Sequence, residues 1–188
     1  MKRDYSIPAG EANLKSLLVV LPMAVVLVFA YQQWYGWQQL LRDMELLYSH
    51  YLISLGAIIG GIILHELIHA IVWVGLGSSS WEQVTFGFNL KGLAPYAHLG
   101  EPVKISVYRA GTLAPGLILG LLPYLAGLVG GIMPLVWFGY LFTIVAGGDF
   151  LMVWLIRDIK KGSMVQDHPE RIGCVVVEER FGNQESGT

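Results

Sequence analysis

Residues 51–77, YLISLGAIIGGIILHELIHAIVWVGLG, form a long apolar run that carries one glutamate and two histidines in its second half. A helix of this length can cross the hydrocarbon core of a bilayer. Ionisable side chains inside such a segment cost insertion free energy, so they are rare there and usually functional. His65, Glu66 and His69 therefore indicate a site within this helix.

The rest of the chain is also apolar. Of its 188 residues, 54% are hydrophobic and 14% are charged, whereas roughly a quarter of the residues in a soluble domain are charged. Three more segments, at residues 16–31, 107–131 and 133–156, are apolar enough to be membrane spans. We expect an all-α membrane protein with about four transmembrane helices, built as a single integral membrane domain over residues 1–188.

The first apolar segment admits a second interpretation. Lys2 and Arg3 precede a run that ends in VLVFA, which could be a signal peptide cleaved after Ala30. The cleavage pattern is imperfect, and the aromatic residues that follow are typical of a membrane interface: Tyr31, Trp34, Tyr35 and Trp37. We therefore expect this segment to be retained as the first span.

The basic residues predict how the spans are oriented. If there are four spans, 11 of the 12 lysines and arginines lie on one side, and only Arg42 lies on the other. The positive-inside rule then places both termini in the cytoplasm, together with the loop 78–106 and the tail 157–188. The net charge of −2 and the lack of a basic stripe indicate no nucleic-acid partner, and the single cysteine, Cys174, excludes an intramolecular disulfide.

Short strands are predicted in the loop and the tail. Residues 84–90 alternate between apolar and polar side chains, and the Lys91–Gly92 pair that follows can form a turn. Pro95 and Pro102 restrict the next stretch to an irregular or edge strand. We expect a hairpin-like insertion here, and a short strand within residues 171–180.

The HELIH stretch has the spacing of a catalytic metal site. His65 and His69 are four residues apart, so their rings project from one face of a helix and can share a metal ion. Zinc suits two imidazoles, and a catalytic zinc has three protein ligands and a water that the metal acidifies. Glu66 would be the general base that takes a proton from this water.

Asp149 is the best candidate for the third ligand. It is the only acidic residue within the segment 133–156, where an unpaired carboxylate is costly. At 1.5 Å per residue, His65 and His69 lie about 16 and 10 Å from the cytoplasmic end of their span, and Asp149 lies about 12 Å from the end of its own. The three side chains are thus predicted to lie at similar depth.

Substrate contacts are predicted in the cytoplasmic loop. His98 could orient a substrate or stabilise an oxyanion. The strand at residues 84–90, which includes Phe86 and Phe88, could hold an unwound substrate segment as an added strand through backbone hydrogen bonds.

The chain resembles intramembrane zinc metalloproteases of the site-2 protease type, which combine an H-E-x-x-H helix with an aspartate ligand from a later helix. It is also similar to a small prokaryotic family of membrane zincin peptidases, on the ordered set HELIHA, YAHLGEPV, LAP, GGD and DHP. The similarity covers roughly residues 51–177. It implies a zinc peptidase of a prokaryotic plasma membrane that cleaves membrane proteins or peptides. The chain lacks the Asn-Pro that site-2 proteases usually carry near the aspartate.

A second class of function stays open. The cluster could hold a metal without catalysis, in a membrane transporter or scaffold. Such a site has no need of a base beside two ligands, so the role of Glu66 separates the two alternatives.

Overall fold

The computed structural model describes residues 3–77, 79–89, 94–168 and 171–177. The helices in these ranges are α1 (Ala9–Tyr35), α2 (Trp37–Ser49), α3 (Tyr51–Leu76), α4 (Ile105–Pro115), α5 (Leu122–Gly130), α6 (Met133–Val145) and α7 (Gly147–Leu155). The strands are β1 (Asp4–Ile7), β2 (Val84–Asn89), β3 (Ala94–Leu99), β4 (Val103–Lys104), β5 (Met164–Asp167) and β6 (Ile172–Val177). The fold is therefore mostly helical, with small antiparallel sheets.

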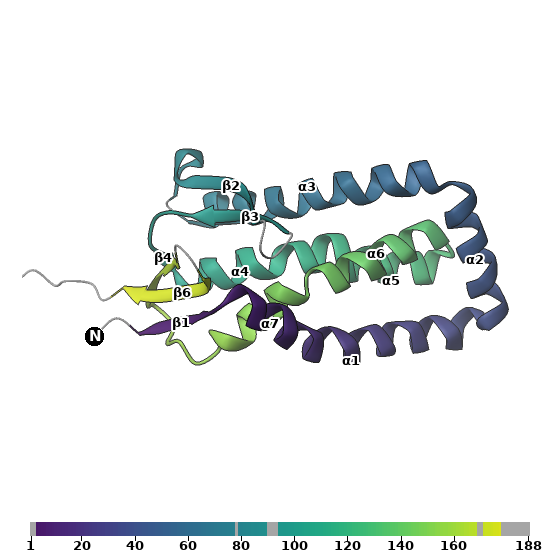
Figure 1. Cartoon of the computed structure of the whole chain (residues 1–188), viewed down its shortest axis with the longest axis horizontal. Helices are drawn as coiled ribbons and strands as arrows, with labels where there is room; N and C mark the ends of the chain where they lie inside the picture. The colour runs from purple at the N-terminus through teal and green to yellow at the C-terminus, as the bar shows by residue number, and fades with distance from the viewer. Residues whose placement is uncertain (1–2, 78, 90–93, 169–170, 178–188) are drawn as a thin grey trace, which may run out of the picture.

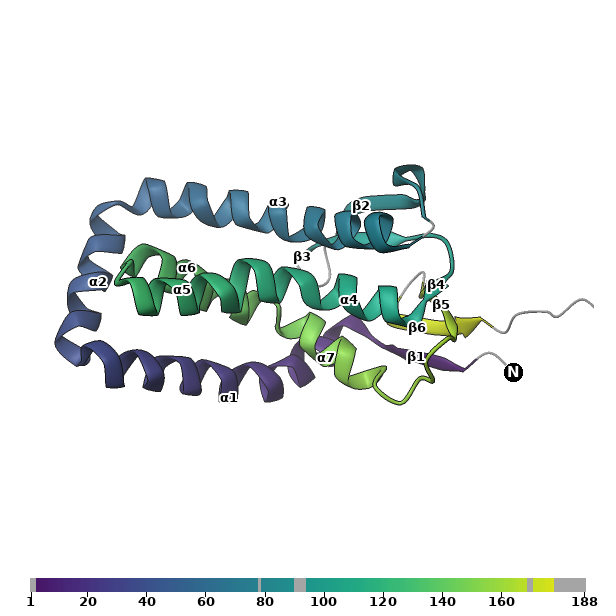
Figure 2. The ribbon, with the colours of Figure 1, turned by 180° about the vertical axis from the view of Figure 1, so that it is seen from behind.

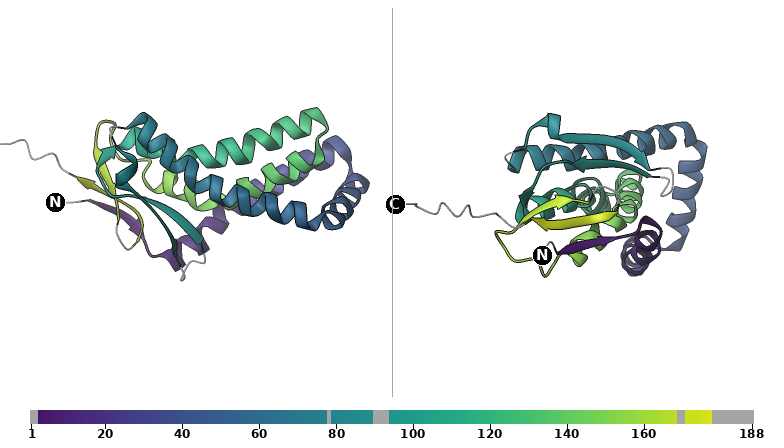
Figure 3. Two further views of the ribbon diagram at one scale, coloured as in Figure 1. Left: turned by 90° about the horizontal axis from the view of Figure 1, so that it is seen from above. Right: turned by 60° about the vertical axis from the view of Figure 1, so that its left-hand side comes forward.

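The long helices lie side by side. The α1 and α3 helices run along opposite sides of the molecule, and α4, α5 and α6 lie between them (Figure 1). The α2 helix crosses one end and joins α1 to α3, as the view from behind also shows (Figure 2). The strands gather at the other end, where the N-terminal strand lies (Figure 3).

Within the described residues, three helices are long and apolar enough to cross a membrane: Gly10–Tyr35, Tyr51–Leu76 and Ile105–Gly130. A fourth can be counted if α6 and α7, which meet at an angle of 43°, are taken as one bent span. The first of these helices, α1, spans Ala9–Tyr35 and is therefore longer than the span predicted at residues 16–31. A π-helical segment, Gly116–Leu121, follows Pro115 and joins α4 to α5, and such segments arise where a proline disturbs the hydrogen-bonding ladder.

The α2 helix was not predicted. Gly36 separates it from α1 and has a φ of 76°, a left-handed backbone conformation that glycine adopts without steric cost. The carboxylate of Asp43 is buried on the inner side of α2, whereas Leu41 and Tyr48 are exposed. This pattern is the reverse of that of a helix on a soluble protein, whose apolar side faces the core.

The beginning and end of the described chain meet in a four-stranded sheet with the order β1-β6-β5-β4. The strand predicted within residues 171–180 is β6, and residues 178–180 lie outside the described residues. The other three strands were not predicted, so the all-α fold class needs this sheet added. A buried core that includes Val165, Cys174 and Trp73 joins the sheet to the helices.

The β2 and β3 strands form a separate antiparallel pair, which lies between α3 and α4 in the chain order. Of the two strands, β3 is the one that packs against α3. Phe86 lies opposite Ala97, and the Gly100 N–H donates to the Gln83 carbonyl at 2.9 Å. Because opposite residues alternate between bonded and unbonded positions, the backbone groups of Phe86 and Ala97 point away from the partner strand. The turn predicted at Lys91–Gly92 lies outside the described residues.

Candidate metal centre

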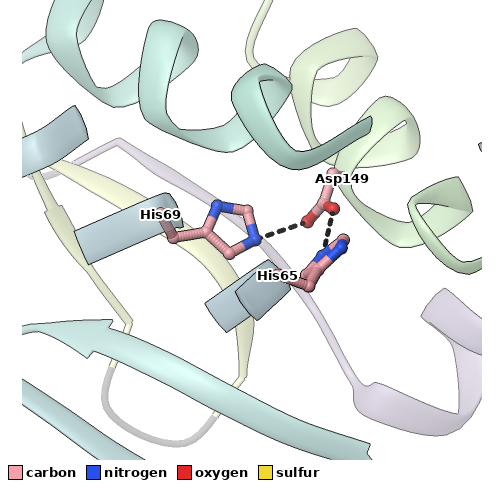
Figure 4. A group of neighbouring side chains, drawn as sticks. All are labelled: His65, His69 and Asp149. Atoms are coloured by element: carbon pink, nitrogen blue, oxygen red, sulfur yellow. Dashed lines mark hydrogen bonds and ion pairs between the residues drawn. The ribbon is translucent and has the colours of Figure 1, made fainter. Parts of the chain in front are cut away.

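His65 and His69 lie on one face of α3 and are almost fully buried. Their rings contact each other edge to face, with centroids 5.0 Å apart. This follows from their spacing, since residues four apart on a helix are neighbours on its surface. Both rings are directed towards Asp149 (Figure 4).

Asp149 lies in the first turn of α7, directly after the bend that separates α7 from α6. Its Oδ2 atom is 3.0 Å from Nε2 of His65, and its Oδ1 atom is 3.5 Å from Nε2 of His69. Two ligand atoms about 2.0–2.1 Å from a tetrahedral zinc lie roughly 3.4 Å apart. The side chains that sequence and depth predicted as ligands are thus brought together at suitable distances.

The hydrogen bonds of the rings also fit a cation. Nδ1 of His69 lies 2.9 Å from the Gly111 carbonyl, which can only accept, so in the neutral ring the proton is on Nδ1 and Nε2 has a lone pair. That lone pair faces a carboxylate oxygen of Asp149, which is also an acceptor. A cation between these atoms would satisfy both. Within the described chain, the buried Nδ1 atom of His65 has no hydrogen-bond partner.

The ring of His69 stacks on Trp73 of the same helix, with ring centroids 5.3 Å apart. The α4 helix packs against Trp73 in turn. A Cβ atom at Gly111 would lie 2.1 Å from Nε1 of Trp73, so only glycine lets α4 come close enough to offer its carbonyl to His69. The sequence carries a signal for the Gly111 carbonyl, because Pro115, four residues later, has no N–H to donate to it and so leaves this carbonyl free of its helix hydrogen bond.

Glu66 is partly buried on α3, next to His65. Its carboxylate lies within electrostatic range of His65, His69 and Asp149, and close to the backbone N–H of Ala97 on β3. The carboxylate thus lies between the candidate metal site and the β3 strand. This is the place that a general base would need, although its role as a base stays a prediction.

Asp167, on β5, holds the hairpin near this site and was not predicted. It accepts hydrogen bonds from the Leu99 N–H at 2.8 Å and the Tyr108 hydroxyl at 2.5 Å, and it lies 3.5 Å from Nδ1 of His98. Burial raises the pKa of the Asp167 carboxyl above its ordinary value, although these two hydrogen bonds oppose that shift. The only sequence signal was its place in the DHP motif, which reads as a turn.

The predicted substrate residues are dispersed. The His98 ring is partly exposed and faces Asp167. Phe86 and Phe88 are 50% and 56% exposed on β2, the strand of the pair that does not pack against α3. No contact joins these three residues to the histidine and aspartate cluster in the part of the chain that the structure describes, and their roles stay predictions.

Residues 58–164, more than half of the chain, match a protein family described as "Putative zincin peptidase". The match includes every member of the candidate metal centre. Among curated proteins and among solved structures, no match was found.

Proposed function

The chain belongs to the family described as "Putative zincin peptidase", and on this premise we propose that it is a membrane-embedded zinc peptidase, similar to site-2 proteases. One observation carries the proposal: ligand atoms of His65, His69 and Asp149, which come from two helices, all lie within 4.8 Å of one another. In a transporter or scaffold, Glu66 would have no reason to lie beside them.

We propose that the site lies within the bilayer. Three helices that could cross a membrane support this, because α3, which carries both histidines, is one of them. The orientation with both termini in the cytoplasm rests on the basic residues. The substrates would be membrane or membrane-proximal proteins, which reach the site from the lipid or from the cytoplasmic surface.

His65, His69 and Asp149 would hold the zinc ion, which would act as a Lewis acid towards the substrate carbonyl. Glu66 would accept a proton from the attacking water as the water oxygen bonds to the carbonyl carbon. The same carboxylic acid would return the proton to the amine nitrogen as the C–N bond breaks. The products are one carboxylic acid, which then loses its proton to solvent, and one amine, and Glu66 ends as it began.

A helical substrate must unwind before its peptide bond can react, because helix hydrogen bonds occupy its carbonyls. The contact between Ala97 and Glu66 favours the outer edge of β3 as the place where the unwound segment pairs. Along this edge Pro95 has no N–H, the Leu99 N–H is bonded to Asp167, and the Ala97 N–H contacts Glu66. A substrate segment that pairs here would therefore take the Ala97 N–H from Glu66, which would free the carboxylate to act as the base. The β3 edge lies closer than the β2 edge to the helix that carries the candidate base, because β3 is the strand that packs against α3.

The opposite pair Phe86 and Ala97 offers a matched test of the two edges. Proline at either position removes an outward N–H and leaves the hairpin ladder bonded. Ala97→Pro is expected to reduce turnover at least tenfold with zinc content unchanged, whereas Phe86→Pro should have little effect. The reverse result would move the substrate to β2.

Elemental mass spectrometry and a peptidase assay together test the proposed function. Purified protein in detergent, freed of its affinity tag, should contain about one zinc per chain and cleave fluorescently labelled casein. Glu66→Gln should keep the zinc and lose turnover by about 10²–10⁴-fold, the usual contribution of a general base. Zinc without any turnover that depends on Glu66 would favour the non-catalytic alternative, and no zinc in the wild type would exclude both.

A further inference from the structure

Arg109, on α4, contacts the far end of the helix that carries Asp149. Its Nη2 atom donates to the carbonyls of Ile156, Arg157 and Ile159, at 2.5, 3.0 and 3.0 Å. These carbonyls belong to the turn that follows the last residue of α7, where the Ile156 carbonyl also accepts a hydrogen bond from the Ile159 N–H at 3.2 Å. A cation is also favourable there because the C-terminal end of a helix dipole is negative.

The direction of α7 depends on contacts of this kind. The chain bends by 43° between α6 and α7, so α6 does not set the direction of α7 by continuing into it. At its N-terminal end, Gly147 packs so closely against α1 that a Cβ atom would lie 2.0 Å from Val20. At its C-terminal end, Arg109 binds the carbonyls. Asp149 lies between these two fixed ends, about 10 Å from Ile156 along the helix.

The α4 helix, which carries Arg109, also contacts His69, another of the proposed ligands. Gly111, two residues after Arg109, accepts the hydrogen bond from the His69 ring. The α4 helix therefore fixes one histidine through a carbonyl and the aspartate helix through a guanidinium. Zinc sites tolerate errors of only about 0.2 Å in ligand distance, so a small shift of α7 would move Asp149 out of bonding range.

From this geometry we infer that Arg109 is a positioning residue for the metal centre, which acts on Asp149 through the C-terminal carbonyls of α7. The inference rests on the metal site of the proposed function and goes beyond its ligands. Loss of a residue that orients a ligand typically lowers metal affinity about 10- to 100-fold. Arg109→Ala is expected to fall in this range, and Arg109→Lys, which keeps the charge on a shorter side chain, is expected to lose less.

Arg157 provides a matched control at the same helix end. Its side chain donates to the Trp154 carbonyl at 2.9 Å and stacks over the Trp154 ring, but it is exposed to solvent. Arg157→Ala also removes a cation from the C-terminus of α7, without touching the contact that Arg109 makes. Its zinc affinity is expected to stay within twofold of the wild-type value.

The test is a zinc titration against a fluorescent chelator in detergent, combined with the visible absorption of the Co²⁺-substituted protein, which reports the ligand set. The expected result is that Arg109→Ala binds Co²⁺ with a spectrum that differs from the wild-type spectrum, because Asp149 is displaced from the ligand set, while helical content by circular dichroism stays unchanged. An affinity within twofold of wild type, or a lower affinity with the wild-type spectrum, overturns the inference. If Arg109→Ala does not fold, Arg109→Lys decides by the same two criteria. A wild-type protein that binds neither metal would instead contradict the proposed function itself.

Discussion

Two carboxylates, one buried and one partly buried, lie on different helices of the bundle and have opposite surroundings. Asp43, on α2, is 2% exposed and accepts hydrogen bonds from the Tyr31 hydroxyl, the Gln39 amide and the Trp137 indole. Asp149, on α7, is 21% exposed at its side chain and faces two imidazoles. One carboxylate is surrounded by neutral donors, and the other by groups that can themselves bind a metal.

The difference shows how a structural polar cluster can be told from a reactive one in an apolar bundle. Every group around Asp43 is a donor directed at its oxygens, so adding a cation would gain nothing. Around Asp149, the lone pair of the His69 ring faces a carboxylate oxygen, so two acceptors face each other with no donor between them. Incomplete satisfaction of buried polar groups, rather than their presence, marks the candidate site.

The largest predicted effect is on metal binding. Asp149→Ala should reduce bound zinc from about one per chain to near zero, since two histidines alone make a weak site. Asp43→Ala should leave the zinc content per folded molecule unchanged. Elemental mass spectrometry of the purified proteins measures both. A zinc content that depends on Asp43, or zinc that is retained without Asp149, would contradict this distinction between the two carboxylates.

The second prediction concerns stability, where we expect Asp43→Ala to have the larger effect and Asp149→Ala the smaller one. Asp43→Ala leaves the buried Tyr31 hydroxyl and the partly buried Gln39 and Trp137 donors without their acceptor. A buried donor in this state costs about 1–3 kcal/mol, so we expect a loss of roughly 2 kcal/mol or more in total. In metal-free protein, Asp149→Ala removes one good hydrogen bond and should cost about 1 kcal/mol. Denaturation by SDS in mixed micelles, with zinc chelated, gives both values. Equal losses would mean that the Asp43 cluster does not brace α2.

Sequence reasoning found the site more readily than the bracing around it. The α3 helix is long, apolar and regular, so its length and the HELIH spacing were predictable, and a rise of 1.5 Å per residue sufficed to match the depth of Asp149. The α2 helix has only 13 residues of mixed polarity, which gives a weak signal in a hydropathy window. The β1 strand has four residues and pairs with β6 at the other end of the chain, and no local pattern encodes such a pairing.

The smallest predicted effect sharpens the comparison with a third carboxylate. Asp167 accepts two hydrogen bonds, yet burial raises its pKa above the ordinary value. Because the folded pKa is the higher one, ionised Asp167 costs stability. This cost is absent below the pKa of an unfolded aspartate, about 4, and it grows until the pH exceeds the raised value. Asp167→Asn removes this titration.

The stability of the wild type relative to Asp167→Asn should therefore fall as the pH rises from 4 to 8, which unfolding curves of both proteins in detergent would measure. A difference that does not change with pH would mean that the donors from Leu99 and Tyr108 compensate fully for burial. The predicted slope would instead show that Asp167 braces the hairpin beside Glu66 at a cost in stability when its carboxylate is ionised.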